Sequence, residues 1–290
     1  MAQPTPHSRG RRDTSAGTNG RTLDAAGRLC DGASAMKIAT WNVNSIRARQ
    51  QRLMDWVASA QPDVLCLQEL KCTDSEFPSL ELRTAAYDAA CYGQRSYNGV
   101  AIASKLPLGN VLRGLDDEAD DQARVIAATA GPVRIISAYA PNGQAVDSAA
   151  FEYKLLWYER LRRYLDAHCD RNQLLVLCGD FNVAPEPRDV HDPALWEGQT
   201  MFTLKERSAL KRVTDFGLVD TFRRHHAEEG RFSWWDYRML AFPKNRGLRI
   251  DHLYATVPLA QKCTVADIDR EARKGSQPSD HAPVWAQFDL

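Results

Sequence analysis

LLVLCGDFN, residues 174–182, is the stretch that decides the fold class. Its five apolar residues, Leu174–Cys178, follow one another without polar alternation, between a polar approach and a glycine. Such a run predicts a short strand buried on both faces. The run leads into Asp180 and Asn182, and layered α/β proteins tend to place their chemistry at the carboxyl ends of buried strands. Asp and Asn also shape turns after strands, so taken alone the two residues fit either role.

A second buried run, Val64–Leu67, ends in the same way, because it runs directly into Gln68 and Glu69. Each half of the chain therefore offers short strands, an acidic strand end and a helix. Two such halves can pack sheet on sheet, which predicts a four-layer α/β/β/α sandwich of two mixed sheets flanked by helices. The other expected strands are Lys37–Val43, Gly99–Ser104, Ala123–Thr129, Val133–Tyr139, Leu248–Ala255 and Val284–Phe288, and helices are expected around Leu53–Val57 and at Phe151–His168 and Leu204–Phe216.

Composition indicates an ordinary globular protein, with 44% hydrophobic and 26% charged residues and a formal net charge of zero. Residues 1–35 are rich in Ser, Thr, Gly, Ala and Arg without periodicity, which predicts a disordered tail before a single domain at 36–290. No apolar run approaches the ~20 residues of a membrane span. The seven cysteines form no CxxC pair and indicate no disulfide framework, so a reducing, cytoplasmic setting is expected. No heptad pattern is visible, and a monomer is expected.

Four carboxylates sit at or beside predicted strands, namely Glu69, Asp180, Asp251 and Asp280. If the strands converge, these groups raise one another's pKa unless a cation relieves the repulsion. Oxygen ligands with no Cys and at most one His favour Mg²⁺, Mn²⁺ or Ca²⁺ over zinc. His281 beside Asp251 would form a proton-handling or phosphate-polarising pair. Neutral donors suited to a phosphoryl oxygen are Tyr139 and Asn182.

Seven motifs, in matching order from Met36 to the C-terminus, resemble those of the exonuclease III and apurinic/apyrimidinic (AP) endonuclease family. They are WNVNSIRA (41–48), LCLQELK (65–71), YAPNGQ (139–144), GDFNV (179–183), FSWWDYR (232–238), NRGLRIDH (245–252) and PSDHAPVW (278–285). The QE, GDFN and SDH elements are shared across the wider exonuclease–endonuclease–phosphatase superfamily. The WNVN-x-x-RA and RFSWWDYR…NRGLRID blocks are similar to the DNA-repair branch. This resemblance implies a DNase I-like sandwich and Mg²⁺-dependent (Mn²⁺ possible) cleavage of duplex DNA, 5′ to abasic sites or from 3′ ends, leaving a 3′-hydroxyl.

The resemblance also assigns roles to residues. It implies that Asp180 activates water, oriented by Asn182, and that Tyr139 and His281, held by Asp251, bind the scissile phosphate. It implies metal ligands at Asn42, Glu69 and Asp280, with second-site candidates at Asp180, Asn182 and His281. The implied DNA contacts are Arg47, Lys71, Arg124, Asn142, Trp235 and Arg238, and the implied abasic-sugar pocket is Trp234, Leu248 and Ile250. Gln144 stands where some relatives have an arginine wedge, and Asn44 stands where some members have an acid.

Two other functions fit parts of this pattern. A phosphatase of the same superfamily, acting on inositol phosphates or sphingolipids, would keep the fold and change the substrate. A non-catalytic DNA-binding protein would keep the sandwich, but buried carboxylates are costly without a function. Individually, Trp234 and Trp235 fit core aromatics equally well, and the arginines of 47–52 and 160–163 fit solvated helix faces.

Overall fold

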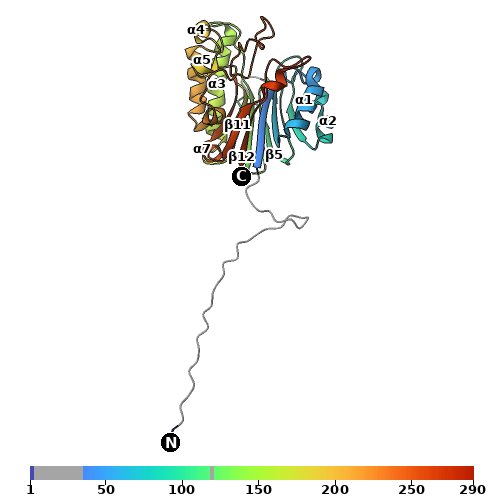
Figure 1. Cartoon of the computed structure of the whole chain (residues 1–290), viewed down its shortest axis with the longest axis vertical. Helices are drawn as coiled ribbons and strands as arrows, with labels where there is room; N and C mark the ends of the chain where they lie inside the picture. The colour runs from blue at the N-terminus through green and yellow to red at the C-terminus, as the bar shows by residue number, and fades with distance from the viewer. Residues whose placement is uncertain (3–34, 118–120) are drawn as a thin grey trace. The chain divides into compact units, whose positions relative to one another are not determined.

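The computed structural model describes residues 1, 2, 35–117 and 121–290, which include both sheets and their flanking helices (Figure 1). The predicted tail lies almost wholly outside the described residues, and Ala35 already belongs to the first strand. Residues Ala35–Leu290 form one unit by themselves. No helix among the described residues is both long and apolar enough to cross a bilayer.

Twelve strands of the described chain form two six-stranded mixed sheets. In the first sheet the order is β11-β12-β1-β2-β4-β3, with β1 at Ala35–Asn42, β2 at Val64–Gln68, β3 at Asp88–Tyr92, β4 at Val100–Ser104, β11 at Cys263–Ile268 and β12 at Val284–Asp289. In the second sheet the order is β5-β6-β7-β8-β10-β9, with β5 at Leu108–Arg113, β6 at Val125–Ala130, β7 at Val133–Tyr139, β8 at Leu175–Asp180, β9 at Leu218–Asp220 and β10 at Asp251–Thr256.

Helices lie outside the sheets on both sides (Figure 1). Those next to the first sheet include α1 at Ile46–Ala60 and α2 at Ser79–Thr84, and those of the second half include α3 at Ala149–His168, α4 at Pro193–Trp196, α5 at Leu204–Thr214, α6 at Thr221–His225 and α7 at Val257–Ala260. Three short 3₁₀ turns lie at Asp74–Glu76, Pro187–Asp189 and Arg270–Arg273.

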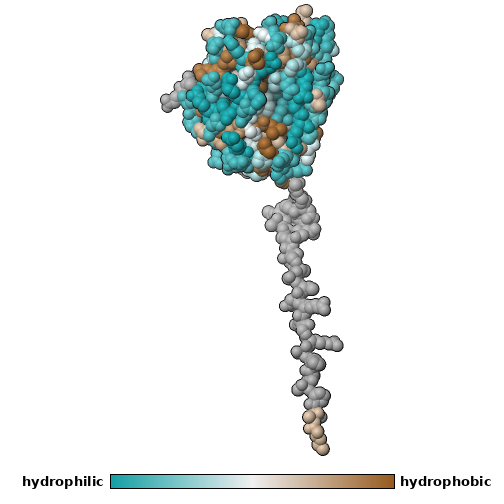
Figure 2. All heavy atoms as spheres, turned by 90° about the vertical axis from the view of Figure 1, so that its left-hand side faces the viewer, coloured by the Kyte–Doolittle hydropathy of each residue, from teal (hydrophilic) through white to brown (hydrophobic). Residues whose placement is uncertain are grey.

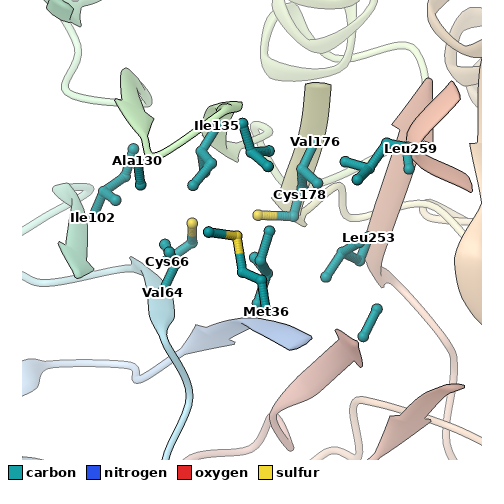
Figure 3. Close-up of a cluster of buried hydrophobic side chains, with 14 of the residues drawn as sticks. Met36, Val64, Cys66, Ile102, Ala130, Ile135, Val176, Cys178, Leu253 and Leu259 are labelled. Carbon is teal, nitrogen blue, oxygen red and sulfur yellow. The ribbon is translucent and has the colours of Figure 1, made fainter. Parts of the chain in front are cut away.

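The core between the sheets consists mostly of small and aliphatic side chains from both (Figure 3). Val64 and Cys66 of β2 face Val176 and Cys178 of β8, and all four are fully buried. The alternate residues of the same strands point outward to the helices. Continuous apolar runs are required here because both faces of each central strand are covered.

Each helical layer uses its periodic apolar face to cover the outer side of one sheet. In α1, Leu53, Trp56 and Val57 pack on β1, where the Trp41 and Trp56 rings meet edge to face at 5.7 Å. In α3, Trp157 and Leu161 belong to the cluster that covers the second sheet. Figure 2 shows the outward face of that second helical layer as mostly hydrophilic with scattered hydrophobic patches. The predicted four-layer sandwich is therefore confirmed.

Gly179 allows β8 to run close beside β7 just before Asp180. A Cβ atom at Gly179 would lie 1.8 Å from the Ala138 carbonyl oxygen, and its φ of +145° disfavours other residues. The register then places Asp180 beside Tyr139 of β7 and opposite Asp251 of β10. Glycine at this position thus sets the spacing of the three polar strand ends.

Some expectations from the sequence need correction. Strand β10 begins at Asp251 and not at Leu248, because Leu248 instead forms isolated bridges with Val190 and Trp234. Strands β3, β5, β9 and β11 escaped prediction; β5, for example, is exposed at most of its positions and has no alternating apolar pattern.

A buried network of charged and polar side chains lies at the start of β10. It is expected to make the free energy of unfolding depend on pH in the acidic range. Arg249 bonds Asp189 at 2.6 Å and donates to Nδ1 of His252, whose Nε2–H donates to the Val183 carbonyl at 2.9 Å. These bonds fix His252 as the neutral tautomer that carries its hydrogen on Nε2. Burial, with the nearby Arg249 charge, lowers the pKa of His252 to about 4.

We therefore expect the free energy of unfolding to fall as pH drops from about 6.5 to about 4. The unfolded chain takes up a proton on this imidazole in that window and the folded chain does not, which costs up to roughly 3 kcal/mol. Urea denaturation of wild type and His252→Gln in EDTA at several pH values measures this. A variant whose pH profile keeps the wild-type slope in that window would contradict the assignment.

Candidate active site

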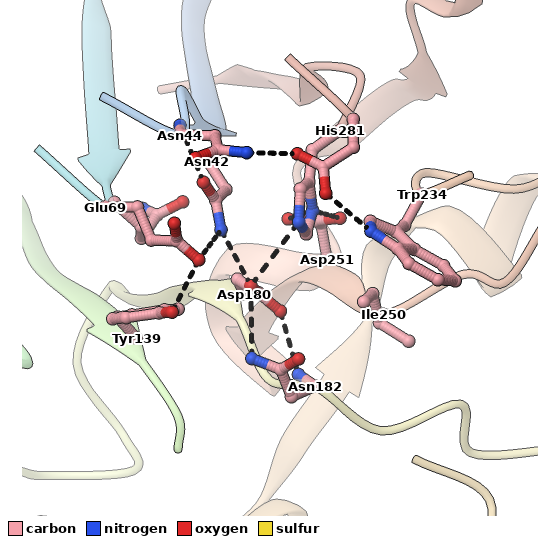
Figure 4. Close-up of polar contacts among 12 residues, drawn as sticks. Asn42, Asn44, Glu69, Tyr139, Asp180, Asn182, Trp234, Ile250, Asp251 and His281 are labelled. Atoms are coloured by element: carbon pink, nitrogen blue, oxygen red, sulfur yellow. Dashed lines mark hydrogen bonds and ion pairs between the residues drawn. The ribbon is translucent and has the colours of Figure 1, made fainter. Parts of the chain in front are cut away.

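Polar strand ends from both sheets meet at one end of the sandwich (Figure 4). Asn42, the last residue of β1, joins the two sheets with its side-chain amide. It donates to Glu69 Oε1 at 3.2 Å and to Asp180 Oδ2 at 2.9 Å. One donor group thus holds two carboxylates, one from each sheet, and the predicted convergence of strand ends is present.

Glu69 follows β2 in a left-handed backbone conformation, with a φ of +52°. Such a conformation is strained for a non-glycine residue and is common at functional sites. Its carboxylate accepts from the Tyr139 hydroxyl at 2.5 Å and pairs with Lys71 at 2.9 Å. Burial acts to raise the pKa of Glu69, but the Lys71 charge and the Tyr139 hydrogen bond outweigh it and lower the pKa. Glu69 is therefore held as an anion.

Asp180 and Asn182 shape a turn and also face the centre of the site. The Asn182 backbone N–H donates to Asp180 Oδ1 at 2.9 Å, and the Asn182 side-chain amide donates to Oδ2 at 3.2 Å. Burial, with the neighbouring Asp251 charge, raises the pKa of Asp180 to about 7. A carboxylate with such a pKa can take a proton from water near neutral pH and return it.

His281 and Asp251 form the predicted pair. His281 Nδ1 lies 2.8 Å from Asp251 Oδ2, and Nε2 lies 3.8 Å from Asp180 Oδ2. Ser233, which sequence reasoning missed, donates to Asp251 Oδ2 at 2.6 Å and fixes that carboxylate. Burial acts to lower the pKa of His281, but the Asp251 and Asp180 charges raise it to about 10. The imidazolium form is thus favoured.

The described residues contain one group of acidic and histidine side chains close enough to share an ion. Ligand atoms of Asp180, Asp251 and His281 all lie within 4.8 Å of one another. Asp180 and His281 were expected ligands of a second metal ion. The third expected ligand, Asn182, donates a hydrogen bond to Asp180. Of the predicted first set, Asn42 and Glu69 are adjacent, whereas Asp280 is linked to them through Asn44. Both sets consist mainly of oxygen donors, which fit a hard divalent cation.

A chain of hydrogen bonds connects Glu69 to Trp234 on the other side of the site. Lys71 pairs with Glu69 and donates to Asn44 Oδ1 at 2.6 Å. The Asn44 side-chain amide donates to Asp280 Oδ1 at 2.9 Å, and the Trp234 indole N–H donates to Asp280 Oδ2 at 3.0 Å. Asn44 thus links a cation and a carboxylate, a role that an acid at this position would not fill.

Three of the expected DNA contacts, Lys71, Arg124 and Asn142, line a hollow with Glu69 and Tyr139, and one expected contact is an exception. Asn142 donates to Asn182 at 3.1 Å, and Lys71 lies beside Glu69. Exposed guanidinium groups are present on Arg47 and Arg238, each paired with a nearby carboxylate, and Arg124 lies over the Tyr139 ring at 5.0 Å. The exception is Trp235, whose expected contact with DNA is wrong.

Trp235 is a core aromatic. Its side chain is fully buried, packs edge to face on Phe242 and donates to Asn245. The ring therefore presents no surface to a ligand.

The predicted apolar pocket is present only in part. Leu248 and Ile250 are buried in a cluster with Val190 and Phe202, against which Trp234 packs. Trp234 borders a cavity, whereas the side chains of Leu248 and Ile250 are fully buried. An open pocket lined by Leu248 and Ile250 is therefore not what the structure shows, because neighbouring apolar side chains cover both.

Lys154 of α3 is a buried positioning residue that sequence reasoning missed. Its ammonium donates to the carbonyls of Asn142, at 3.0 Å, and Asn182, at 2.7 Å, and to Glu206 Oε1 at 2.5 Å. Neither side chain of the Lys154–Glu206 pair is exposed. The pair thus anchors from below the two loops that carry Asn142 and Asn182.

We expect Lys154→Met to lower the free energy of unfolding by about 3–5 kcal/mol, because it leaves the Glu206 charge buried and unpaired. Adding Glu206→Gln should restore part of this loss. Urea denaturation of the single and double variants tests the prediction, with Lys205→Met, an exposed neighbour, as the control. A double variant that is less stable than Lys154→Met would contradict this account.

Comparison with known proteins places this site in a family. The endonuclease/exonuclease/phosphatase family model matches residues 39–281. Exodeoxyribonuclease III of Haemophilus influenzae is 35% identical over 266 residues, covering 87% of this chain and all of that protein. Two solved structures each share 40% identity and cover 88% of this chain and all of theirs: an AP endonuclease from Archaeoglobus fulgidus, with a TM-score of 0.86, and the 3′ phosphatase NExo from Neisseria bound to product DNA hairpin, with a TM-score of 0.85. The chain therefore belongs to the endonuclease/exonuclease/phosphatase family, as an exodeoxyribonuclease III-like enzyme of its AP endonuclease branch, as its motifs predicted.

Proposed function

We propose that this enzyme is a Mg²⁺-dependent DNA-repair nuclease. It hydrolyses the phosphodiester 5′ to an abasic site, or the last phosphodiester of a 3′ end, and leaves a 3′-hydroxyl. The observation that carries the proposal is the meeting of Asp180, Asn42 and the His281–Asp251 pair at one point between the sheets. This set contains a base with a pKa near neutrality and a cationic donor.

Asp180 removes a proton from water as the oxygen attacks phosphorus. Its orientation is fixed by donors from Asn42 and Asn182, so the basic lone pairs face one direction. The His281 imidazolium, held by Asp251, donates to a phosphoryl oxygen as negative charge develops there. The bond from phosphorus to the 3′ oxygen breaks, and that oxygen takes up a proton to become the 3′-hydroxyl.

A magnesium ion (Mn²⁺ as a substitute) would be held by Glu69 and Asn42, with Asp280 nearby. When bound it would act as a Lewis acid on the phosphate. The fit rests on the donor set, since Glu69 is kept anionic by Lys71 and Tyr139. Residues of the Asp180, Asp251 and His281 group are the candidates for a second ion.

Double-stranded DNA is the proposed partner, bound by a monomer. The Neisseria relative is bound to product DNA hairpin, and the Archaeoglobus relative is an AP endonuclease, which supports DNA as the substrate. Arg47, Lys71, Arg124, Asn142 and Arg238 would contact phosphates on either side of the cut. Trp234 would contact the sugar next to it.

The experiment that tests the function uses a labelled duplex with one internal tetrahydrofuran abasic analogue. The enzyme is incubated with Mg²⁺ or with EDTA, and products are resolved beside markers. We expect a metal-dependent nick immediately 5′ to the analogue. Intact duplex together with phosphate release from inositol phosphates would establish a phosphatase instead, and DNA binding without cleavage under any metal would establish a non-catalytic binder.

A further inference from the structure

Three polar side chains lie between the two sheets, one step along the strands from the active site. Thr40 of β1, Gln68 of β2 and Ser137 of β7 are fully buried, and we call them the polar layer. Farther from the site the same rows are apolar, because Ile38 precedes the threonine by two residues and Ile135 precedes the serine by two. Alternate strand residues share a face, so the interior of the sandwich changes from apolar side chains to this layer and then to the carboxylates.

Gln68 joins the two sheets within the polar layer. Its side-chain amide donates to Ser137 Oγ at 3.0 Å and to Thr40 Oγ1 at 3.0 Å. Ser137 belongs to the second sheet, and the other two residues belong to the first. Packed sheets lie about 10 Å apart, so a short serine side chain reaches the facing sheet only through a long partner. The glutamine therefore sets the distance between β2 and β7 at this level.

The contacts of the polar layer are repeated one step higher, in the active site (Figure 4). Tyr139 follows the serine by two residues and donates to Glu69 Oε1 at 2.5 Å. Asn42 follows the threonine by two residues and donates to the same oxygen at 3.2 Å. Glu69 itself directly follows Gln68. Each of these two contacts of Glu69 is thus matched by a contact of Gln68 with the same partner strand.

The backbone at Glu69 also depends on the residue before it. Its φ of +52° is a strained conformation, which persists only where the surrounding structure holds it. The Gln68 carbonyl accepts from the Val43 backbone N–H at 3.1 Å, and the Gln68 side chain is held by the two hydroxyls. The residue that leads into the turn is therefore fixed in both its backbone and its side chain.

Stability alone does not require polar side chains at these positions. Replacing all members of a buried polar network by apolar groups of similar shape is often neutral or stabilising. What apolar groups lack is direction, since a hydrogen bond specifies one arrangement of its donor and acceptor. The polar layer therefore adds a defined spacing of the sheets at the level just before the active site.

We propose that Thr40, Gln68 and Ser137 are positioning residues, which hold the two sheets at the spacing that lets Asn42 reach Glu69 and Asp180 together. The inference rests on the proposed function, because Glu69 and Asn42 are its proposed metal ligands. If the spacing relaxes, the two ligands no longer face one point, and a divalent cation binds less tightly. Hydrogen-bonded groups behind a metal ligand typically change metal affinity roughly 10–100-fold.

The test measures stability and Mg²⁺ affinity separately. A triple variant, Thr40→Val with Gln68→Met and Ser137→Ala, removes every polar side-chain atom of the layer at nearly constant volume. Two single variants divide the threonine, since Thr40→Val loses the hydroxyl and Thr40→Ser loses the methyl group. Thr256→Val is the matched control, because Thr256 is fully buried at the far end of β10 and its hydroxyl donates to the Gln173 carbonyl at 2.7 Å.

Urea denaturation in EDTA gives the midpoint of unfolding, and calorimetry on the DNA-free enzyme gives the Mg²⁺ affinity. We expect the triple variant to keep or exceed the wild-type midpoint while it binds Mg²⁺ about tenfold or more weakly and cuts the tetrahydrofuran duplex correspondingly slowly. Thr40→Val should also bind Mg²⁺ more weakly. Thr40→Ser should have a lower midpoint with near wild-type affinity, and Thr256→Val should change the midpoint alone.

Wild-type Mg²⁺ affinity in both the triple variant and Thr40→Val would overturn the proposal. It would equally be overturned if affinity fell only in step with the urea midpoint across the four variants, because the layer would then act on stability alone. Metal affinity is measured without DNA, so failure of the proposed function is distinguishable. Wild type that binds Mg²⁺ and cuts no duplex would overturn the nuclease, while the affinities of the variants would still decide this inference.

Discussion

Asp180→Asn is expected to slow phosphodiester cleavage by on the order of 10²–10⁴-fold, the usual contribution of a general base or acid. The asparagine keeps the size of the side chain and loses its ability to accept a proton from water. Single-turnover cleavage of the tetrahydrofuran duplex with enzyme in excess measures this step. Asp166→Asn, an exposed carboxylate on α3, is the matched control.

Asp180→Asn is also expected to change how the free energy of unfolding depends on pH. Burial raises the pKa of Asp180 to about 7, so the folded chain binds a proton there that the unfolded chain releases above about pH 4. As pH rises from about 4 to about 7 in the absence of metal, wild type therefore loses the stability that this proton contributes, and Asp180→Asn lacks this contribution. A variant that is both inactive and unfolded would contradict the proposed role, since the activity loss would then have a structural cause.

Glu69→Gln is expected to raise the Mg²⁺ concentration needed for half-maximal activity by on the order of 10–100-fold or more, which is the cost seen even for groups behind a metal ligand. The substitution removes the charge that Lys71 and Tyr139 hold in place. Metal titration by calorimetry on the DNA-free enzyme measures the affinity directly, and activity at high Mn²⁺ should recover in part.

Glu81→Gln provides the control for this prediction, because Glu81 is an exposed carboxylate on α2 away from the site. If Glu69→Gln lowers the cleavage rate and leaves metal affinity at the wild-type value, Glu69 does not bind the ion. Its role would then be to hold Tyr139 and Lys71.

The fold was predictable because its central strands are read from uninterrupted apolar runs. Val64–Leu67 and Leu175–Cys178 are buried on both faces, and each run leads to a carboxylate at the same edge of the sandwich. Apolar residues at helical spacing likewise predicted α1 and α3. The edge strands β3 and β5 were missed, because strands that are partly solvated and short give a weak pattern.

The residues of the site could be predicted where the chemistry requires a particular side chain. They were harder to predict where the packing of the fold determines whether a side chain is buried and which partner it contacts. The pairing of His281 with Asp251 was expected and is present. For Trp235 the sequence left a DNA contact and a core position equally open, because a run of aromatic residues does not show which of them faces solvent; the structure buries it. The anchoring by Lys154 depends on Glu206, 52 residues away, and a lysine within an amphipathic helix gives no sign of such a partner.

The most direct test of the account is to identify both new ends after cleavage of the tetrahydrofuran duplex in water enriched in ¹⁸O, using mass spectrometry. Direct attack of water at phosphorus predicts a 3′-hydroxyl on the upstream fragment and one ¹⁸O atom in the 5′ phosphate of the downstream fragment. The Asp180→Asn variant should give the same products at a much lower rate. A phosphate left on the upstream 3′ end, or a 5′ phosphate without ¹⁸O, would contradict hydrolysis 5′ to the site and the role given to Asp180.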